Sequence, residues 1–150
     1  MIAFADTSFV YALHVAQEHS SRASEIYHRH LGHVAIGRLT CFEFRQSLRL
    51  KSFRHAADAR LGLSAADASK VLAQFDANLR DNVFAVLKSD LPRILEIAEE
   101  LSSKYTPSFG SRSMDLLLVA NAIHVHAEYF LTFDLAQRRL AELAGLTVEG

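Results

Sequence analysis

Four acidic residues in this sequence point to chemistry, because each stands just after an expected strand or in the first turn of the following helix. Carboxyl ends of parallel strands meet at one edge of a sheet, where open α/β folds bind ligands. Converging carboxylates repel one another unless a cation neutralises them, and Mg²⁺ and Mn²⁺ prefer such oxygen ligands. A metal held there lowers the pKa of water and offsets charge on a leaving oxygen, which suits phosphodiester cleavage. The four acids are Asp6, Glu43, Asp115 and Asp134.

A structural explanation competes for each acid taken alone. A carboxylate at a helix N-terminus is stabilised there by about 0.3–1 kcal/mol, so any of the four is compatible with simple helix capping. The two interpretations are balanced for Asp134, because Leu135 begins an expected helix directly after it. Capping explains the whole set less well, since four caps have no reason to converge.

The spacing of apolar residues predicts the elements that position these acids. Short apolar or β-branched runs alternate with longer segments that carry apolar residues at helical spacing. This alternation predicts an α/β fold, a three-layer α/β/α sandwich with a central parallel sheet of four to five strands. No linker or repeat interrupts it, so we expect one domain over residues 1–150. The expected strands are 2–5, 34–37, 83–87, 129–132 and 146–148, and the expected helices run over about 9–16, 20–31, 40 onward, 64–79, 91–105, 115–123 and 135–144.

Composition places the chain among ordinary globular proteins. Of its 150 residues, 50% are hydrophobic and 22% are charged, which suits a domain with a substantial core. The single cysteine, Cys41, excludes an internal disulfide and favours a reducing compartment, with a buried thiol as its ordinary role. Neither a signal peptide nor an apolar run of the ~20 residues that cross a membrane is recognisable. We therefore expect a cytoplasmic protein that does not associate with membranes.

The charge distribution is uneven although the total is small. A net charge of −1 and an isoelectric point near 6.7 give no global attraction to nucleic acid. Between Arg38 and Arg60, however, six basic residues stand against two acids. A solvated helix face is the favoured interpretation of this stretch, and a phosphate-binding patch is the alternative.

The eight histidines make no recognisable metal site. None stands in an HExxH or zinc-finger spacing. His28 and His30, like His124 and His126, are two residues apart on expected helices, so each pair diverges by about 200°. We expect the histidines on surfaces or interfaces.

Four segments carry the acids in the order of the strand–helix pattern. They are ADTSF at 5–9, CFEF at 41–44, RSMDLLLVANA at 112–122 and LTFDLAQRRLAELAGLTV at 131–148. Each is a weak signal alone, but together they resemble the PIN domain family over the whole chain. More narrowly, they resemble the VapC-type ribonuclease toxins of VapBC toxin–antitoxin pairs.

The resemblance implies a five-stranded parallel sheet and an acidic quartet that binds Mg²⁺ or Mn²⁺ and cleaves RNA. Carried over to this sequence, the catalytic quartet is Asp6, Glu43, Asp115 and Asp134. Asp6 and Asp115 would hold the metal directly, and Glu43 and Asp134 would complete its shell through water or position the attacking water. The resemblance also implies a type II toxin that a cognate antitoxin neutralises, and a homodimer.

Hydroxyl residues flank the quartet at positions that the family also uses. They are Thr7, Ser8 and Thr132. Helix capping is their favoured interpretation, and orientation of a carboxylate or of a metal-bound water is the alternative.

Three arginines are candidates for contact with RNA. Arg45 and Arg49 belong to the basic stretch that begins beside Glu43. Arg112 precedes Asp115 by three residues, so an ion pair with a quartet carboxylate is as good an interpretation as RNA contact.

The resemblance leaves two ways in which an antitoxin would bind this chain. Phe9, Tyr11 and Phe53 are candidates for an exposed groove that takes an antitoxin helix. Alternatively, the antitoxin inserts a basic side chain among the acids and blocks the metal.

Two other functional classes compete with the nuclease. A phosphatase of the haloacid-dehalogenase type would use Asp6 as nucleophile, but it needs a second Asp two residues on, where Ser8 stands. A non-catalytic PIN-like module that binds RNA or protein is the stronger alternative.

Overall fold

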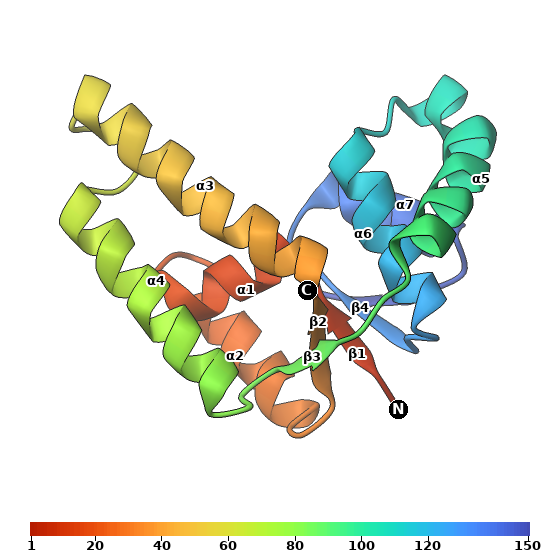
Figure 1. The fold of residues 1–150 in the computed structure, drawn as a ribbon, viewed down its shortest axis with the longest axis horizontal. Helices are drawn as coiled ribbons and strands as arrows, with labels where there is room; N and C mark the ends of the chain where they lie inside the picture. Colours follow the sequence, from red (N-terminus) through yellow and green to blue (C-terminus); the bar gives the residue numbers. More distant parts are fainter.

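The computed structural model describes residues 1–150, and its seven helices surround a single five-stranded sheet (Figure 1). This arrangement confirms the predicted α/β/α sandwich. No helix combines the length and the hydrophobicity that crossing a bilayer requires. The elements in chain order are β1 (Ala3–Ala5), α1 (Thr7–His14), α2 (Ser20–Arg29), β2 (Val34–Gly37), α3 (Arg38–Ala57), α4 (Ala65–Arg80), β3 (Ala85–Leu87), α5 (Leu91–Phe109), α6 (Ser113–His124), β4 (Tyr129–Leu131), α7 (Leu135–Leu143) and β5 (Thr147–Glu149).

All strand pairs are parallel, and the strand order is β3-β2-β1-β4-β5. Strand β1 is central and fully buried, because its alternate side chains enter two separate cores. Ala3 and Ala5 face the core built with α1 to α4, whereas Phe4 faces the core built with α5 to α7. The carboxyl ends of β1, β2 and β4 consequently lie side by side at one edge.

Helix α3 begins directly where strand β2 ends, at Gly37. Gly37 is extended and acts as the N-cap, so the helix starts two residues before the predicted Thr40. Glu43 is therefore the sixth helical residue, and the prediction that it occupies the first turn was wrong. A methyl group at Gly37 would lie 2.0 Å from Nδ2 of Asn121, so glycine is required for β2 to pack against α6.

Strand β3 is shorter and more exposed than the sequence suggested. The predicted strand at 83–87 is reduced to Ala85–Leu87, and Val86 is exposed because β3 is the outer strand of the sheet. Phe42, an apolar residue of α3, is 58% exposed and lines a hollow together with Val86. The apolar residues of α3 that do pack are Phe44 and Leu48, both fully buried.

Helix α5 continues past its predicted end near Tyr105 to Phe109. Pro107 lies in the last turn, where its missing N–H removes one backbone bond without breaking the helix. Gly110 then ends the helix in the left-handed conformation and donates its N–H to the carbonyl of Thr106.

His30 is buried and His14 is half-buried, whereas positions on surfaces or interfaces were expected. His14 packs among the rings of Phe44, Phe75 and Phe84, and its burial lowers its pKa. His30 is buried, and its Nε2 lies 3.1 Å from Oε1 of Glu149 in the last strand. Both rings tie separate elements together instead of serving a site.

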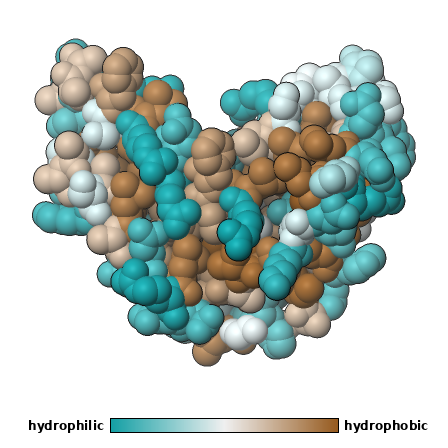
Figure 2. Space-filling view, in the orientation of Figure 1, coloured by the Kyte–Doolittle hydropathy of each residue, from teal (hydrophilic) through white to brown (hydrophobic).

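The molecule is hollowed between α3 and α4 on one side and α5 and α6 on the other (Figure 2). Helices α3 and α4 pack on each other and project beyond the sheet (Figure 1). Phe53, on the projecting part of α3, is 73% exposed, whereas Phe9 is fully buried. Phe9 therefore does not line the predicted antitoxin groove, because α1 turns it into the core.

Candidate active site

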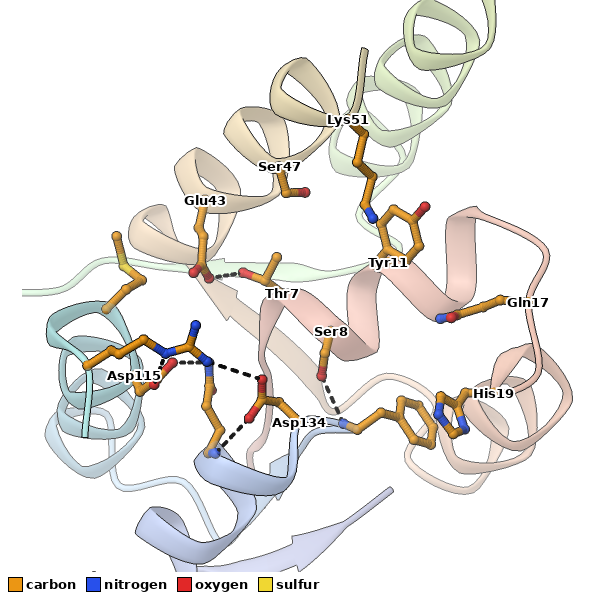
Figure 3. Close-up of a pocket in the computed structure, with 14 residues that line it drawn as sticks. Thr7, Ser8, Tyr11, Gln17, His19, Glu43, Ser47, Lys51, Asp115 and Asp134 are labelled. Atoms are coloured by element: carbon orange, nitrogen blue, oxygen red, sulfur yellow. Dashed lines mark hydrogen bonds and ion pairs between the residues drawn. The ribbon is translucent and has the colours of Figure 1, made fainter. Parts of the chain in front are cut away.

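A cavity of about 470 Å³ brings together three of the four predicted acids (Figure 3). Glu43 reaches it from α3, Asp115 from the first turn of α6, and Asp134 from the start of α7. The three residues are separated by up to 91 positions in sequence and meet because their helices start at the same edge of the sheet. Capping alone gives no reason for this meeting.

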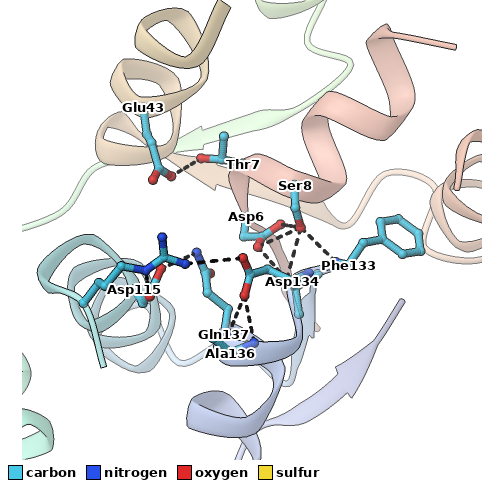
Figure 4. A network of polar contacts seen from close by, with 11 residues as sticks. Asp6, Thr7, Ser8, Glu43, Asp115, Phe133, Asp134, Ala136 and Gln137 are labelled. Atoms are coloured by element: carbon cyan, nitrogen blue, oxygen red, sulfur yellow. Dashed lines mark hydrogen bonds and ion pairs between the residues drawn. The ribbon is translucent and has the colours of Figure 1, made fainter. Parts of the chain in front are cut away.

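Asp6 lies beneath the cavity with none of its surface exposed. As the N-cap of α1, it accepts the N–H of Phe9 at 2.8 Å. The hydroxyl of Ser8 lies 2.8 and 3.0 Å from its two carboxylate oxygens, and the hydroxyl of Thr132 donates to Oδ2 at 2.5 Å (Figure 4). These donors engage both oxygens of the carboxylate.

Burial raises the pKa of Asp6 to about 7, although the hydrogen bonds from Thr132, Phe9 and Ser8 work in the opposite direction. The negative charge of Glu43 raises the pKa slightly further. Near neutral pH this carboxyl group therefore exists in both protonation states. A nearby cation would favour the ionised state.

Ser8 connects Asp6 to the backbone beside Asp134 (Figure 4), and Thr132 makes a second connection of this kind. Ser8 Oγ accepts the N–H of Phe133 at 2.8 Å, and Thr132 Oγ1 accepts the N–H of Asp134 at 3.0 Å. The two hydroxyls thus fix the first acid relative to the fourth. Neither hydroxyl caps a helix, so the favoured prediction for Ser8 and Thr132 was wrong.

Glu43 is oriented by the third hydroxyl, that of Thr7, which donates to Oε2. Burial raises the pKa of Glu43, the bond from Thr7 lowers it, and the charges of Asp115 and Asp134 raise it again. The charges of Asp115 and Asp134 thus act on Glu43, as expected for carboxylates that line one cavity.

Asp134 has a structural role as the N-cap of α7. Its Oδ1 accepts the N–H groups of Ala136 and Gln137 at 2.8 and 3.0 Å. Asp134 therefore caps α7 in addition to lining the cavity. The amide of Gln137 also donates to Oδ1 of Asp115 at 3.2 Å. The amide oxygen of Gln137 is buried and has no partner.

Arg112 lies between two of the acids. Its Nε is 3.3 Å from Oδ2 of Asp115, and its Nη2 is 4.0 Å from Oδ2 of Asp134. The arginine side chain is 75% exposed, so these pairs are weakly held. A guanidinium therefore stands where a cation shared by the two carboxylates would be attracted.

The donor chemistry of this cluster fits a hard divalent cation. All four predicted ligands offer carboxylate oxygens. Burial raises the pKa of Asp6 and of Glu43, and a cation beside them would hold both carboxylates in the ionised form. The unpartnered oxygen of Gln137 adds a further neutral donor beside Asp115. The side chains are not already gathered around one point, since no three His, Cys, Asp or Glu residues form a ready ligand group.

Two of the predicted RNA contacts lie outside the cavity. Arg45 pairs with Asp76 at 2.7 Å and covers the ring of Phe75, whose centroid is 5.3 Å away. Arg45 and Arg49 line the separate hollow beside Phe42. Of the three candidate arginines, only Arg112 reaches the acids.

The cavity extends beyond the acids to residues that were not among the predicted site residues. Ser47 and Lys51 follow Glu43 at intervals of four on α3, and Tyr11 follows Thr7 by four on α1. Such spacing places side chains on one helix face and was visible in the sequence. His19, from the α1–α2 connection, carried no comparable signal.

Comparison with known proteins agrees with this architecture. The model of the PIN domain family matches residues 3–143. No curated protein gives a significant match. Among solved structures, FitAcB from Neisseria gonorrhoeae has a TM-score of 0.65 at 16% identity, covering 100% of this chain and 97% of that one.

Two further structures show the same fold. VapBC2 from Rickettsia felis, bound to a DNA fragment from their promoter, has a TM-score of 0.70 at 14% identity over 99% of this chain and 98% of that one. VapBC-1 from nontypeable Haemophilus influenzae has a TM-score of 0.61 at 14% identity, with 99% and 97% covered. With the family match extending over nearly the whole chain, this protein belongs to the PIN domain family.

Proposed function

We propose that this chain is a Mg²⁺- or Mn²⁺-dependent endoribonuclease and the toxin of a type II toxin–antitoxin pair. The observation that carries the proposal is the meeting of Glu43, Asp115 and Asp134 in one cavity directly above Asp6. Members of the PIN family are generally nucleases, so this acidic cavity is the natural place for phosphodiester hydrolysis. We take residues 1–150 as a single PIN domain that acts in the cytoplasm.

The acidic quartet would hold the cation. Asp6 and Asp115 would bind it directly, and Glu43 and Asp134 would bind it through water. When bound, the metal supplies Lewis acidity, which lowers the pKa of water and neutralises charge on the leaving oxygen. Asp6 has to release its proton for this role, which a pKa of about 7 allows at neutral pH.

The remaining polar residues position the acids. Thr7 holds Glu43 in its place, while Ser8 and Thr132 hold Asp6. Each hydroxyl can rotate its hydrogen away from a carboxylate oxygen that turns to the cation. Arg112 has to leave the acids when the cation arrives, and it then lies free to contact an RNA phosphate.

The fold likeness supports the toxin role and its partner. FitAcB and two VapBC proteins, from three organisms, share this architecture at 14–16% identity. We propose that a cognate antitoxin lies along α3, where Phe53 is exposed, and brings a basic side chain to the position that Arg112 occupies. We also propose a homodimer, for which exposed Phe42 and Val86 beside the outer strand β3 provide apolar surface.

RNA cleavage tests the enzymatic proposal. Wild-type protein and Asp115→Asn are incubated with a set of structured RNAs in Mn²⁺ or Mg²⁺, with EDTA as a third condition. Cleavage confined to metal-loaded wild type supports the proposal. Equal cleavage by both proteins reveals a contaminating ribonuclease. If the wild type cleaves no RNA, the result argues for a non-catalytic binding module instead.

That alternative is a non-catalytic module that binds RNA or a protein. One observation favours it, namely that the oxygens of Asp6 are fully buried and engaged by hydroxyl and backbone donors. Asp115→Asn would then leave the function of the protein intact. RNA affinity that is unchanged by the variant, together with absent cleavage, identifies this case.

A further inference from the structure

The acids occupy only one end of the cavity, and a second group of side chains lines the other end (Figure 3). This second group comprises Tyr11, Gln17, His19, Lys51 and Phe133. It differs in chemistry from the acidic end, because it offers a cation and aromatic rings. Both ends belong to one continuous space, so a single extended ligand can touch both.

Lys51 gives this end a free positive charge. Its Nζ lies 4.7 Å from the centroid of the Tyr11 ring, and it has no carboxylate partner. Arg112 is the other basic residue of the cavity wall that carries a permanent charge, and it is paired with Asp115 and Asp134. Lys51 stands eight residues after Glu43 on the same helix face, roughly 12 Å along α3.

His19 and Phe133 give the same end a stacking surface. The His19 ring lies parallel to the Phe133 ring, with centroids 4.7 Å apart and planes inclined by 5°. Phe133 stacks in turn on buried Phe9, at 5.8 Å and 5°. The rings are therefore anchored in the core, while the side chain of His19 is 42% exposed.

We infer that this end of the cavity is a nucleotide-binding subsite for single-stranded RNA, next to the scissile phosphate. Lys51 binds a neighbouring phosphate, and the rings of His19 and Tyr11 stack on an unpaired base. The inference rests on the proposed ribonuclease function. In that function the cation and Arg112 meet the RNA at the acidic end, whereas Lys51 lies about 12 Å further along α3, without a carboxylate partner, where it can bind a second phosphate of the same strand.

The chemistry of the subsite favours RNA in single-stranded form. Bases in a duplex hide their faces, whereas an unpaired base can stack on an aromatic ring without regard to its identity. The expected substrate is thus a loop or an unpaired strand, with little preference for the stacked base.

Binding of a labelled RNA of about ten unpaired nucleotides tests the inference. The RNA is titrated by fluorescence anisotropy, in Mg²⁺ and at salt from roughly 50 to 200 mM. The protein carries Asp115→Asn so that the RNA stays intact. Lys51→Met is the first added variant, because methionine keeps an apolar stem without the charge. Lys104→Met is its matched control, since Lys104 makes the same contact with Tyr105, at 5.0 Å, away from the cavity.

Loss of one phosphate contact predicts that Lys51→Met weakens RNA binding and reduces the slope of log affinity against log salt by about 0.7. His19→Ala is expected to weaken binding roughly 5- to 150-fold, as the loss of one stacked base does, without changing the slope. His19→Phe keeps the ring and should restore binding. Melting temperatures of all variants identify any that fail to fold.

Unchanged affinity in Lys51→Met and His19→Ala would overturn the subsite, as would an equal loss in Lys104→Met. Cleavage by wild type but not by Asp115→Asn would leave the ribonuclease function standing in that case. Conversely, RNA affinity that depends on Lys51 in a chain that never cleaves supports the subsite and refutes the nuclease. The two proposals therefore fail separately.

Discussion

Asp6 makes the stability of the metal-free protein depend on pH in an unusual direction. Its pKa is raised from 3.8 to about 7 because the folded chain buries it completely. The folded chain thus keeps a proton at Asp6 in a range where the unfolded chain has released it. The free energy of unfolding consequently falls as pH rises from about 4 to about 7, and then levels off.

The size of this effect follows from the pKa shift. The rise in the pKa of Asp6 from 3.8 to about 7 lowers the free energy of unfolding by about 4 kcal/mol at pH 8, relative to low pH. Glu43, whose pKa is also raised, acts in the same direction. His14 acts in the opposite direction, because its lowered pKa makes the folded chain lose a proton that the unfolded chain keeps. The contribution of Asp6 is therefore isolated by comparing wild type with Asp6→Asn.

Asparagine keeps the shape of Asp6 and an oxygen that accepts from Phe9, but it carries no charge. In EDTA, Asp6→Asn should melt at or below the wild-type temperature at pH 5 and up to about 10 °C above it at pH 8. Differential scanning calorimetry measures both. Asp90→Asn is the control, since Asp90 caps α5 but is exposed. A difference between Asp6→Asn and wild type that stays constant from pH 5 to pH 8 would refute the reasoning.

Three further variants address single contacts. Arg112→Met removes the cation that competes at Asp115 and Asp134, so Mn²⁺ should bind several-fold more tightly by isothermal titration calorimetry; weaker binding would assign Arg112 a supporting role instead. Thr7→Val removes the hydrogen bond that lowers the pKa of Glu43, so the pH dependence of Mn²⁺ affinity should move to higher pH. An unchanged pH dependence would contradict the role of Thr7 in holding Glu43 ionised. Gly37→Ala places a methyl group 2.0 Å from the side-chain amide of Asn121 in α6. The variant should lower the free energy of unfolding in urea by about 1–3 kcal/mol, and an unchanged value would mean that α6 can shift to make room.

The sequence predicted the sheet and the convergence of the acids because both depend on local patterns. Apolar runs marked the strands, and parallel strands bring their carboxyl ends together wherever the connecting helices lie. What escaped prediction depended on distant partners. The contact of Asp6 with Thr132 joins residues 126 positions apart, and no local pattern encodes it.

Exposure at the rim of the fold was equally out of reach. Val86 lies on an apolar run like those of the inner strands, yet β3 is the outer strand of the sheet. The strand order is a property of the whole chain, so burial could not be assigned strand by strand. Ser47 and Lys51, by contrast, were predictable from their spacing after Glu43.

The strand order also governs when the acidic cavity comes into existence during synthesis of the chain. The chain first lays β2 and β3 on one side of β1, and only later returns to place β4 and β5 on the other side. Asp6 and Glu43 come from the first half, whereas Asp115 and Asp134 come from the second. A ribosome that has released only the first hundred residues or so has therefore made a polypeptide with half a site. The ribonuclease activity proposed above would therefore need both halves of the fold, because the first half alone carries only Asp6 and Glu43.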